Sequence, residues 1–507
     1  MDLTRRTLIG SIALAAGAWA APPAFEFEEA TVGDLQKRMA AGSLTAHELT
    51  ARYLERIAAI DKRGPALNSV IELNPDALPI ATALDAERKA KGPRGPLHGI
   101  PVLIKDNIDT ADRMMTTAGS LALLGSIAAH DSGVAQRLRA AGAVLLGKTN
   151  LSEWANYRSS HSTSGWSGRG GLTRNPYALN RNACGSSSGS GVAVSANLCA
   201  LAIGTETDGS IVCPSSLNGV VGIKPTLGLI PAAGIIPIAH SQDTAGPMAR
   251  TVADAAILLG ALTGADYTRS LDPRGLRGAR IGVARDKFFG FNEPTDRLID
   301  GAIAEMKKRG AEIVDPADIP TAGKFDDTES VVLSYEFKND LNLYLGALGP
   351  KAPVHSLADV IAFNESHRAR EMPYFGQDIM VKAQSRGPLT SKEYLDALED
   401  DHRLSRTEGI DAVMNKYRLD ALVAPTAGPA WCTDLINGDH ASGGSSTPAA
   451  VAGYPNINVP AGMVFGLPVG ISFFGKAQSE ALLIKLAYAF EQATRHRQPP
   501  RFRPRAL

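Results

Sequence analysis

Two kinds of hydrophobic spacing distinguish the beginning of the chain from the residues after it. Residues 21–95 carry apolar side chains at helical spacing, most clearly from Leu49 to Ile60. Thr45 and Glu48 form a capping-box pattern in front of that run. Residues 97–107 instead place apolar side chains one after another, which predicts a buried strand. We therefore expect a helical N-terminal layer that is followed by a core containing strands.

The next part of the chain predicts a strand, a helix and a second strand in sequence. The helix covers Asp131 to Ala141 and the second strand covers Ala143 to Leu146. This order is typical of an α/β fold, and it predicts a central mixed, largely parallel sheet. Further elements expected in this catalytic core, residues 96–265, are strands at 220–223 and 235–238 and a helix at 252–262.

Charge and irregular spacing increase between residues 266 and 420. A helix at 294–309 and a strand at 312–314 form the clearest unit there, and polar helices follow. We expect a peripheral helical segment that covers the substrate. Apolar strands return in residues 421–507, which are interpreted as the return of the core. No repeat of fixed period divides the chain, and residues 21–507 are interpreted as a single domain.

The first 20 residues show the pattern of an export signal. Arg5 and Arg6 precede an apolar run from Leu8 to Ala20, and Ala18 to Ala20 has the small-x-small spacing of a cleavage site. Paired arginines before such a run resemble a twin-arginine signal. The run of about 12 apolar residues is shorter than the ~20 that a membrane anchor needs to span a bilayer. We therefore expect cleavage near Ala20, no membrane attachment afterwards, and a periplasmic or secreted protein.

The charge balance argues against two classes of partner. The 507 residues include 52 basic and 52 acidic side chains, so no net charge attracts nucleic acid or an anionic membrane. A small or neutral substrate is favoured. The four cysteines, Cys184, Cys199, Cys213 and Cys432, lack C-x-x-C spacing, and neither a metal nor a cofactor is expected. We interpret them as small buried hydrophobic residues, while a disulfide stays open for an exported protein.

Arg181 to Pro214 is the stretch whose composition indicates chemistry. Two serine-glycine clusters, 184–191 and 205–210, enclose an apolar segment of small residues. Glycine and serine let a backbone approach a ligand closely and direct N–H groups at developing negative charge. A flexible linker is not usually bounded by apolar residues such as Val192 and Ile203. The stretch is therefore a candidate active site.

Two familiar motifs fit this stretch poorly. Residues 185–189 match G-x-S-x-G, which makes Ser187 a candidate nucleophile of the α/β-hydrolase kind. That motif requires an apolar strand leading into it, whereas residues 178–183 are polar and turn-like. The ten histidines are scattered, and none has an obviously catalytic setting. A phosphate-binding loop is not favoured either, because no Gly-Lys-Ser/Thr follows the glycines.

The apolar residues of the predicted strand 97–107 lead directly into Lys105, which is unusual for a charged side chain. A lysine at this position is either the solvent-reaching end of an edge strand or a partly desolvated functional amine. The residue alone leaves both interpretations open.

Five motifs follow one another along the chain: Gly99–Asp106, Cys184–Ser190, Thr205–Ile211, Gly222–Thr226 and Asp243–Arg250. In this order they resemble the amidase signature family, and the resemblance extends from about Thr31 to the C-terminal helix. The motifs are most similar to those of bacterial peptide amidases, which hydrolyse the C-terminal amide of peptides. The resemblance implies the amidase signature fold, in which helices cover both faces of the sheet.

The resemblance also implies a Ser-Ser-Lys site. Matched position by position, the family's catalytic lysine falls on Lys105, its bridging serine on Ser186 and its nucleophile on Ser210, 24 positions further on. A buried lysine whose pKa is lowered can be neutral and accept a proton, which Ser186 would relay from Ser210. The family's bridging serine follows a cis peptide bond, so the bond before Ser186 is expected to be cis.

The implied oxyanion hole consists of the backbone N–H groups of Thr207, Asp208, Gly209 and Ser210. Many family members have Asp at the position of Glu206 and Gly at that of Asp208. Because only the backbone of residue 208 is needed, catalysis is not put in doubt. We interpret the Asp208 side chain as influencing substrate preference or stabilising the turn.

The expected function is therefore an amidase that hydrolyses a carboxamide, in a peptide or a small molecule, through a Ser210 acyl-enzyme. One alternative is an amidotransferase A-type subunit, which supplies ammonia to charged tRNA and requires cytosolic partner subunits. The export signal argues against it. A second alternative is a non-catalytic binding protein of the same fold, which the presence of all three catalytic side chains disfavours.

Overall fold

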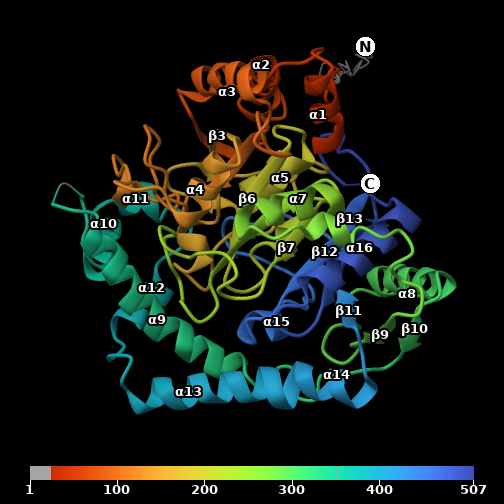
Figure 1. Cartoon of the computed structure of the whole chain (residues 1–507). Helices are drawn as coiled ribbons and strands as arrows, with labels where there is room; N and C mark the ends of the chain where they lie inside the picture. The colour runs from red at the N-terminus through yellow and green to blue at the C-terminus, as the bar shows by residue number, and fades with distance from the viewer. Residues whose placement is uncertain (1–23, 351, 507) are drawn as a thin grey trace, which may run out of the picture.

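A large β-sheet forms the centre of the molecule (Figure 1). The structure is a computed structural model that describes residues 24–350 and 352–506, so the predicted export signal at residues 1–20 lies outside the described residues. Within this range, eleven strands pair in the order β1-β3-β2-β6-β8-β7-β12-β13-β11-β9-β10. The strands are β1 (Val70–Leu73), β2 (Pro101–Lys105), β3 (Val144–Thr149), β6 (Leu201–Glu206), β7 (Val221–Lys224), β8 (Thr244–Ala249), β9 (Arg280–Val283), β10 (Glu312–Val314), β11 (Ala421–Pro425), β12 (Asn456–Val464) and β13 (Leu467–Phe474).

Parallel pairs are confined to two blocks of this sheet. β3, β2 and β6 run parallel to one another, and so do β11, β9 and β10. The six other pairs in the described sheet are antiparallel: five of them arise because β8, β7, β12 and β13 alternate in direction between the blocks, and the sixth joins β1 to β3. The predicted α/β fold with a mixed sheet is confirmed, and its parallel character is strongest around β2 and β6.

Helices cover both faces of the sheet, as expected. α5 (Ser188–Ser195) and α7 (Val252–Thr263) both pack against β6 and β8. α6 (Val212–Leu217) packs beside α5 and against β7, β12 and β13. α4 (Gly133–Ala140) and α16 (Glu480–Thr494) contact α7. Every residue of α5 is buried, because its small Ser, Gly, Ala and Val side chains let it lie close to the strands.

The N-terminal helices form the predicted layer at one end of the sheet, at the top of Figure 1. The Thr45 hydroxyl accepts the Glu48 N–H at 3.0 Å and begins the second helix. One short strand, β1, also lies in this part and pairs with β3. The helices are α1 (Val32–Ala40), α2 (Ala46–Arg56) and α3 (Ala77–Lys91).

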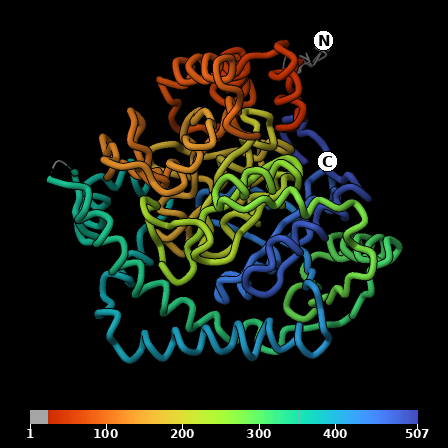
Figure 2. Tube along the Cα trace, in the orientation of Figure 1, coloured from red at the N-terminus to blue at the C-terminus, as the bar shows by residue number. Residues whose placement is uncertain are grey.

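The segment 266–420 contains two different parts. Its first part adds β9 and β10 to the sheet edge, with α8 (Glu293–Lys308) between them. Its second part is helical and runs along the outside of the molecule, as the green-to-cyan chain in Figures 1 and 2 shows. We call residues 326–417 the helical arm; its main helices are α9 (Asp326–Ala347), α10 (Leu357–Ser366), α12 (Asp378–Gln384), α13 (Lys392–His402) and α14 (Asp411–Tyr417).

The predicted strand at 235–238 is wrong. Only Ile235 takes part in pairing, through an isolated bridge to Ile108. Pro237 has no N–H to donate, and Gly234 turns the chain with a φ of 78°. The isoleucines are buried all the same, so the apolar run reflects a buried loop. None of the helices that the structure describes is long and apolar enough to cross a membrane.

Candidate active site

The segments that carry the three predicted catalytic residues lie at the same end of the parallel strands β2 and β6. β2 ends at Lys105, and the chain leaving its parallel neighbour β6 turns through Ser210 into α6. Because neighbouring parallel strands end at the same edge, these two segments lie together, in the position where α/β sheets usually bind ligands. Ser186 lies just before α5, which packs on both strands.

Lys105 is fully buried and is held by Ser186 and Thr205. Its Nζ donates to Ser186 Oγ at 2.7 Å, to Thr205 Oγ1 at 2.8 Å and to the Thr205 carbonyl oxygen at 3.2 Å. Asn107 Nδ2 also donates to Thr205 Oγ1, at 3.0 Å. Burial lowers the pKa of Lys105 to about 7, although two nearby carboxylates raise it. Of the two interpretations left open by the sequence, the structure supports the desolvated amine.

Ser186 lies in a tightly enclosed turn. The Gly185–Ser186 peptide bond is cis, as the resemblance implies. A side chain at position 185 would overlap Ser152 Oγ, which explains the glycine. The Ser152 N–H donates to the Ser186 carbonyl oxygen at 3.0 Å. These contacts fix the backbone from which the Ser186 hydroxyl reaches Lys105.

Ser187, the serine of the G-x-S-x-G motif, has a different environment. Its hydroxyl donates to the Thr205 carbonyl oxygen at 3.0 Å and accepts the Thr205 N–H at 3.1 Å. The side chain is fully buried. Both hydrogen-bonding functions of the hydroxyl are therefore used to join the start of α5 to β6.

Residues 207–210, which we call the Ser210 turn, carry the implied oxyanion hole. Gly209 has a φ of 75°, a conformation that glycine adopts readily. Within the described residues, no hydrogen bond uses the four backbone N–H groups of this turn or the Ser210 hydroxyl. The Ser210 carbonyl oxygen accepts the Ser187 N–H at 3.2 Å, and Ser210 is 8% exposed. The turn can thus offer a hydroxyl and N–H donors to a ligand.

Side chains from outside the predicted set hold the Ser210 turn at both ends. Glu206 Oε2 accepts the N–H groups of Ile211 and Val212, at 2.7 and 3.0 Å, where α6 begins. Thr447 Oγ1 donates to Asp208 Oδ2 at 2.7 Å, so the Asp208 side chain stabilises the turn. Burial raises the pKa of both carboxyl groups.

The loop before β8 supplies two more contacts to this turn. Thr207 Oγ1 donates to Asp243 Oδ1 at 2.6 Å, and Gln242 Nε2 donates to the Thr207 carbonyl oxygen at 3.2 Å. The same Nε2 donates to Glu329 Oε1 on α9 at 2.8 Å. Gln242 is 2% exposed and thereby connects the Ser210 turn to the helical arm. Asp243 lies in the fifth sequence motif, but nothing in the sequence singled out Gln242.

A second side-chain group joins the same loop to α9. His240 Nδ1 lies 2.8 Å from Asp340 Oδ2, and its Nε2 lies 3.3 Å from Glu336 Oε1. The hydrogen bond to Asp340 raises the pKa of His240, although partial burial opposes this effect. Among the described residues this is the one group of side chains with metal-ligand chemistry. Each ring nitrogen already faces a carboxylate, which is the arrangement of an ion pair.

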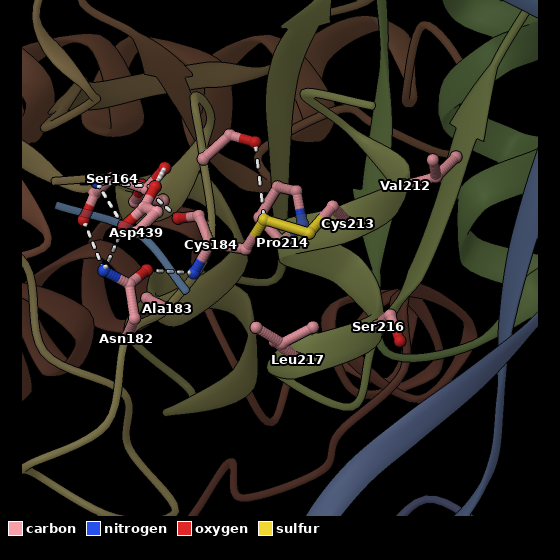
Figure 3. Close-up of a disulfide and its surroundings, with 12 residues drawn as sticks. Ser164, Asn182, Ala183, Cys184, Val212, Cys213, Pro214, Ser216, Leu217 and Asp439 are labelled. Atoms are coloured by element: carbon pink, nitrogen blue, oxygen red, sulfur yellow. Dashed lines mark hydrogen bonds between the residues drawn. A yellow bond between two sulfur atoms is a disulfide. The ribbon is translucent and has the colours of Figure 1, made fainter. Parts of the chain in front are cut away.

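The cysteines differ from the expectation of four buried hydrophobic residues. Cys184 and Cys213 form a disulfide with an S–S distance of 2.02 Å and a Cα–Cα distance of 6.0 Å (Figure 3). Cys199 is buried and unpaired, as predicted, whereas Cys432 is exposed. The two cysteines are 29 positions apart in the sequence, and the fold brings them together. The sequence alone therefore did not reveal that they pair.

Known proteins with similar sequences and folds indicate the class to which this chain belongs. The family model described as Amidase matches residues 48–484. A probable amidase of Arabidopsis thaliana is 44% identical over 503 residues, which cover 94% of this chain and 92% of that protein. A glutamyl-tRNA(Gln) amidotransferase subunit from a Synechococcus strain is 33% identical over 502 residues, or 93% of each chain.

A solved structure is more similar still. Native peptide amidase from Stenotrophomonas maltophilia is 52% identical and superposes with a TM-score of 0.91, covering 94% of this chain and 100% of that one. The fold and these matches define an enzyme that hydrolyses amides. The chain belongs to the amidase signature family. The alternative of a non-catalytic binding protein is set aside.

Proposed function

We propose that Ser210 is the nucleophile of this amide hydrolase, that Ser186 relays its proton, and that Lys105 is the base. The observation that carries the proposal is the 2.7 Å contact between Lys105 Nζ and Ser186 Oγ in a fully buried setting. With a pKa of about 7, a substantial share of Lys105 is neutral at neutral pH. A serine hydroxyl needs such a base to attack an amide.

The first half of the reaction transfers two protons and forms one bond. Neutral Lys105 accepts the hydroxyl proton of Ser186, and the Ser186 oxygen takes the proton of Ser210. The electron pair on Ser210 Oγ attacks the carboxamide carbon, and the carbonyl π electrons move onto the oxygen. The free N–H groups of the Ser210 turn stabilise that oxyanion; in other enzymes, one such donor is worth about 10² to 10³ in rate.

The second half releases the two products. As the C–N bond breaks, the proton returns through Ser186 to the nitrogen, and ammonia or an amine departs. The oxyanion electrons re-form the carbonyl, which leaves the acyl group as an ester on Ser210 Oγ. Water attacks this ester while Ser186 and Lys105 accept its proton. The ester C–Oγ bond then breaks, the proton returns from Lys105 through Ser186 to Ser210 Oγ, and the carboxylic acid leaves.

The proposed substrate class is the C-terminal carboxamide of peptides. Support comes from the identity of 52% to the peptide amidase of Stenotrophomonas maltophilia, which extends over the full length of that chain. The amidotransferase subunit is less similar, with 33% identity. That alternative predicts turnover of glutamine in place of peptide amides.

The proposed location is the periplasm or the cell exterior. The paired residues Arg5 and Arg6 and the short apolar run to Ala20 support export. Cell fractionation tests this proposal independently of activity. Recovery of the protein with its N-terminus near residue 21 from the periplasm or medium is expected, and full-length protein in the cytosol would contradict it.

An amide panel with ammonia detection tests the function. The panel contains peptide amides, amino-acid amides, anilides and glutamine, and it compares the wild type with Ser210→Ala. We expect the fastest turnover on peptide amides and its loss in the variant. Unchanged turnover in Ser210→Ala would refute the nucleophile, and turnover of glutamine alone would support the amidotransferase alternative.

A further inference from the structure

The Cys184–Cys213 disulfide joins the two segments that carry the serines. Cys184 precedes Ser186 by two positions, and Cys213 follows Ser210 by three. Figure 3 shows the bond crossing from the Cys184 loop to the start of α6. The covalent link therefore lies next to the two residues whose relative position the proposed proton relay requires.

The Cys213 end of the disulfide is attached to the Ser210 turn by a backbone hydrogen bond, and the Cys184 end is held by the Asn182 side chain. The Cys213 N–H donates to the Gly209 carbonyl oxygen at 2.8 Å, so Cys213 is fixed directly to the Ser210 turn. The Cys184 N–H donates to Asn182 Oδ1 at 2.7 Å, and Asn182 Nδ2 donates to the Ser164 carbonyl oxygen at 3.0 Å (Figure 3). A shift of either sulfur would therefore move the adjoining backbone.

Noncovalent contacts also join the two segments. The Ser187 N–H donates to the Ser210 carbonyl oxygen at 3.2 Å, and Asn218 Nδ2 donates to the Ala183 carbonyl oxygen at 2.9 Å. Both segments are further enclosed by α5, α6 and the sheet. The fold thus has support that is independent of the disulfide, and we expect the folded chain to persist when the bond is opened.

The two cysteines of this bond differ in exposure. Cys184 is 6% exposed, whereas Cys213 is partly exposed to solvent. Thiolate attack on a disulfide needs access to one sulfur atom only. The bond is therefore chemically addressable in the folded protein.

We propose that the Cys184–Cys213 disulfide is a redox-dependent positioning element that aligns Ser186 with Ser210. The inference rests on the proposed function and concerns the regulation of the same site. The two thiols form the S–S bond by giving two electrons and two protons to a disulfide oxidant. A dithiol reverses the step, supplies two electrons and two protons, and becomes a disulfide itself. Full activity would then require an oxidising compartment, in agreement with the proposed export.

The test compares the oxidised protein with the same protein treated with dithiothreitol. Peptide mapping and thiol alkylation establish the state of the bond, peptide-amide turnover gives kcat and KM, and circular dichroism reports the fold. We expect kcat to fall about tenfold to a hundredfold on reduction, with KM changed less than about twofold, because small misalignment costs rate more than binding. Labelling of Ser210 by a fluorophosphonate should slow in parallel, and reoxidation should restore both rates.

Two variants complete the test. Cys184→Ala with Cys213→Ala should show the same low kcat and no response to dithiothreitol. Cys432→Ser removes the exposed free thiol and should keep both the wild-type rate and the response. Wild-type kcat in reduced protein, global unfolding on reduction, or oxidised protein without a 184–213 cross-link would each overturn the inference. Failure of the proposed function is distinct, because oxidised Ser210→Ala would then remain active.

Discussion

The proposed base and the proposed nucleophile of this site lie in contrasting environments. Lys105 is fully buried, and its Nζ donates to three oxygen atoms of Ser186 and Thr205. The Ser210 turn is also mostly buried, with Ser210 8% exposed and Asp208 half-buried, but it keeps its N–H groups and hydroxyl free of hydrogen bonds within the described residues. Its stability comes from outside the turn, through Glu206, Gln242 and other side chains. A desolvated amine and a hydroxyl free to bind a ligand are thus provided by separate segments, and in the proposed relay Ser186 connects them.

The largest loss of kcat is expected at Ser210, which is compared here with Ser187, the serine of the G-x-S-x-G motif. Ser210→Ala should lower kcat about 10⁴-fold or more, as removal of a serine nucleophile does elsewhere. Ser187→Ala leaves the backbone N–H of Thr205 without the hydroxyl oxygen that accepts it and should cost about 1 to 3 kcal/mol of stability. Fluorophosphonate labelling and steady-state kinetics check both variants. Loss of labelling in Ser187→Ala alone would reverse the assignment.

The next effect compares two buried lysines. Lys105→Met should lower kcat about 10²- to 10⁴-fold, the usual contribution of a general base. Lys148 is also fully buried, and its Nζ donates to the Ile108 carbonyl oxygen and to Thr116 Oγ1 at 2.9 Å. Lys148→Met should lower the thermal midpoint yet keep kcat within about threefold. Equal losses of kcat in the two variants would mean that burial alone explains the effect of Lys105.

A smaller effect is expected at the support of the Ser210 turn. Gln242→Ala removes the donor to Thr207 and should lower kcat about tenfold with little change in KM, because it loosens the oxyanion donors. Gln377 is a matched control, since its Nε2 also donates to a carbonyl oxygen, that of Ile361, and to a glutamate. Gln377→Ala should reduce stability without lowering kcat. Similar kcat in both variants would show that Gln242 has only a structural role.

The smallest effect is expected at Asp208. Asp208→Asn retains an oxygen that can accept the Thr447 hydroxyl, and only the backbone N–H of residue 208 enters the proposed oxyanion hole. We expect kcat on a neutral peptide amide to change less than about threefold. A loss above about tenfold would assign a direct role in the reaction to the carboxylate.

The sequence offered candidates for the chemistry but not for the side chains that support them. Lys105, Ser186 and Ser210 lie in motifs whose order and spacing resemble a known family, so local sequence was enough to select them. The contact between Gln242 and Glu329 joins residues 87 positions apart, and that between Asp208 and Thr447 spans 239. No local pattern predicts such pairs, because the tertiary fold alone brings them together.

The hydrophobic pattern did not predict the secondary structure where all sides of an element are buried or where a proline prevents strand pairing. α5 carries small buried residues on all sides, so it has no amphipathic pattern to mark it as a helix. The run at 235–238 looks like a strand but contains Pro237 and is a buried loop. The cysteines had no diagnostic spacing, and only the fold identified the pair Cys184 and Cys213.

The pH dependence of single-turnover acylation, measured in the wild type and in Lys105→Ala, tests the central claim most directly. Only the neutral amine accepts a proton, so a lowered pKa predicts a rate that is small at low pH and rises through a midpoint of about 7. In Lys105→Ala this ionisation should disappear, and the remaining rate should be closest to that of the wild type at high pH. The same midpoint in both proteins, or wild-type rates in the variant, would contradict the role of Lys105 as the base.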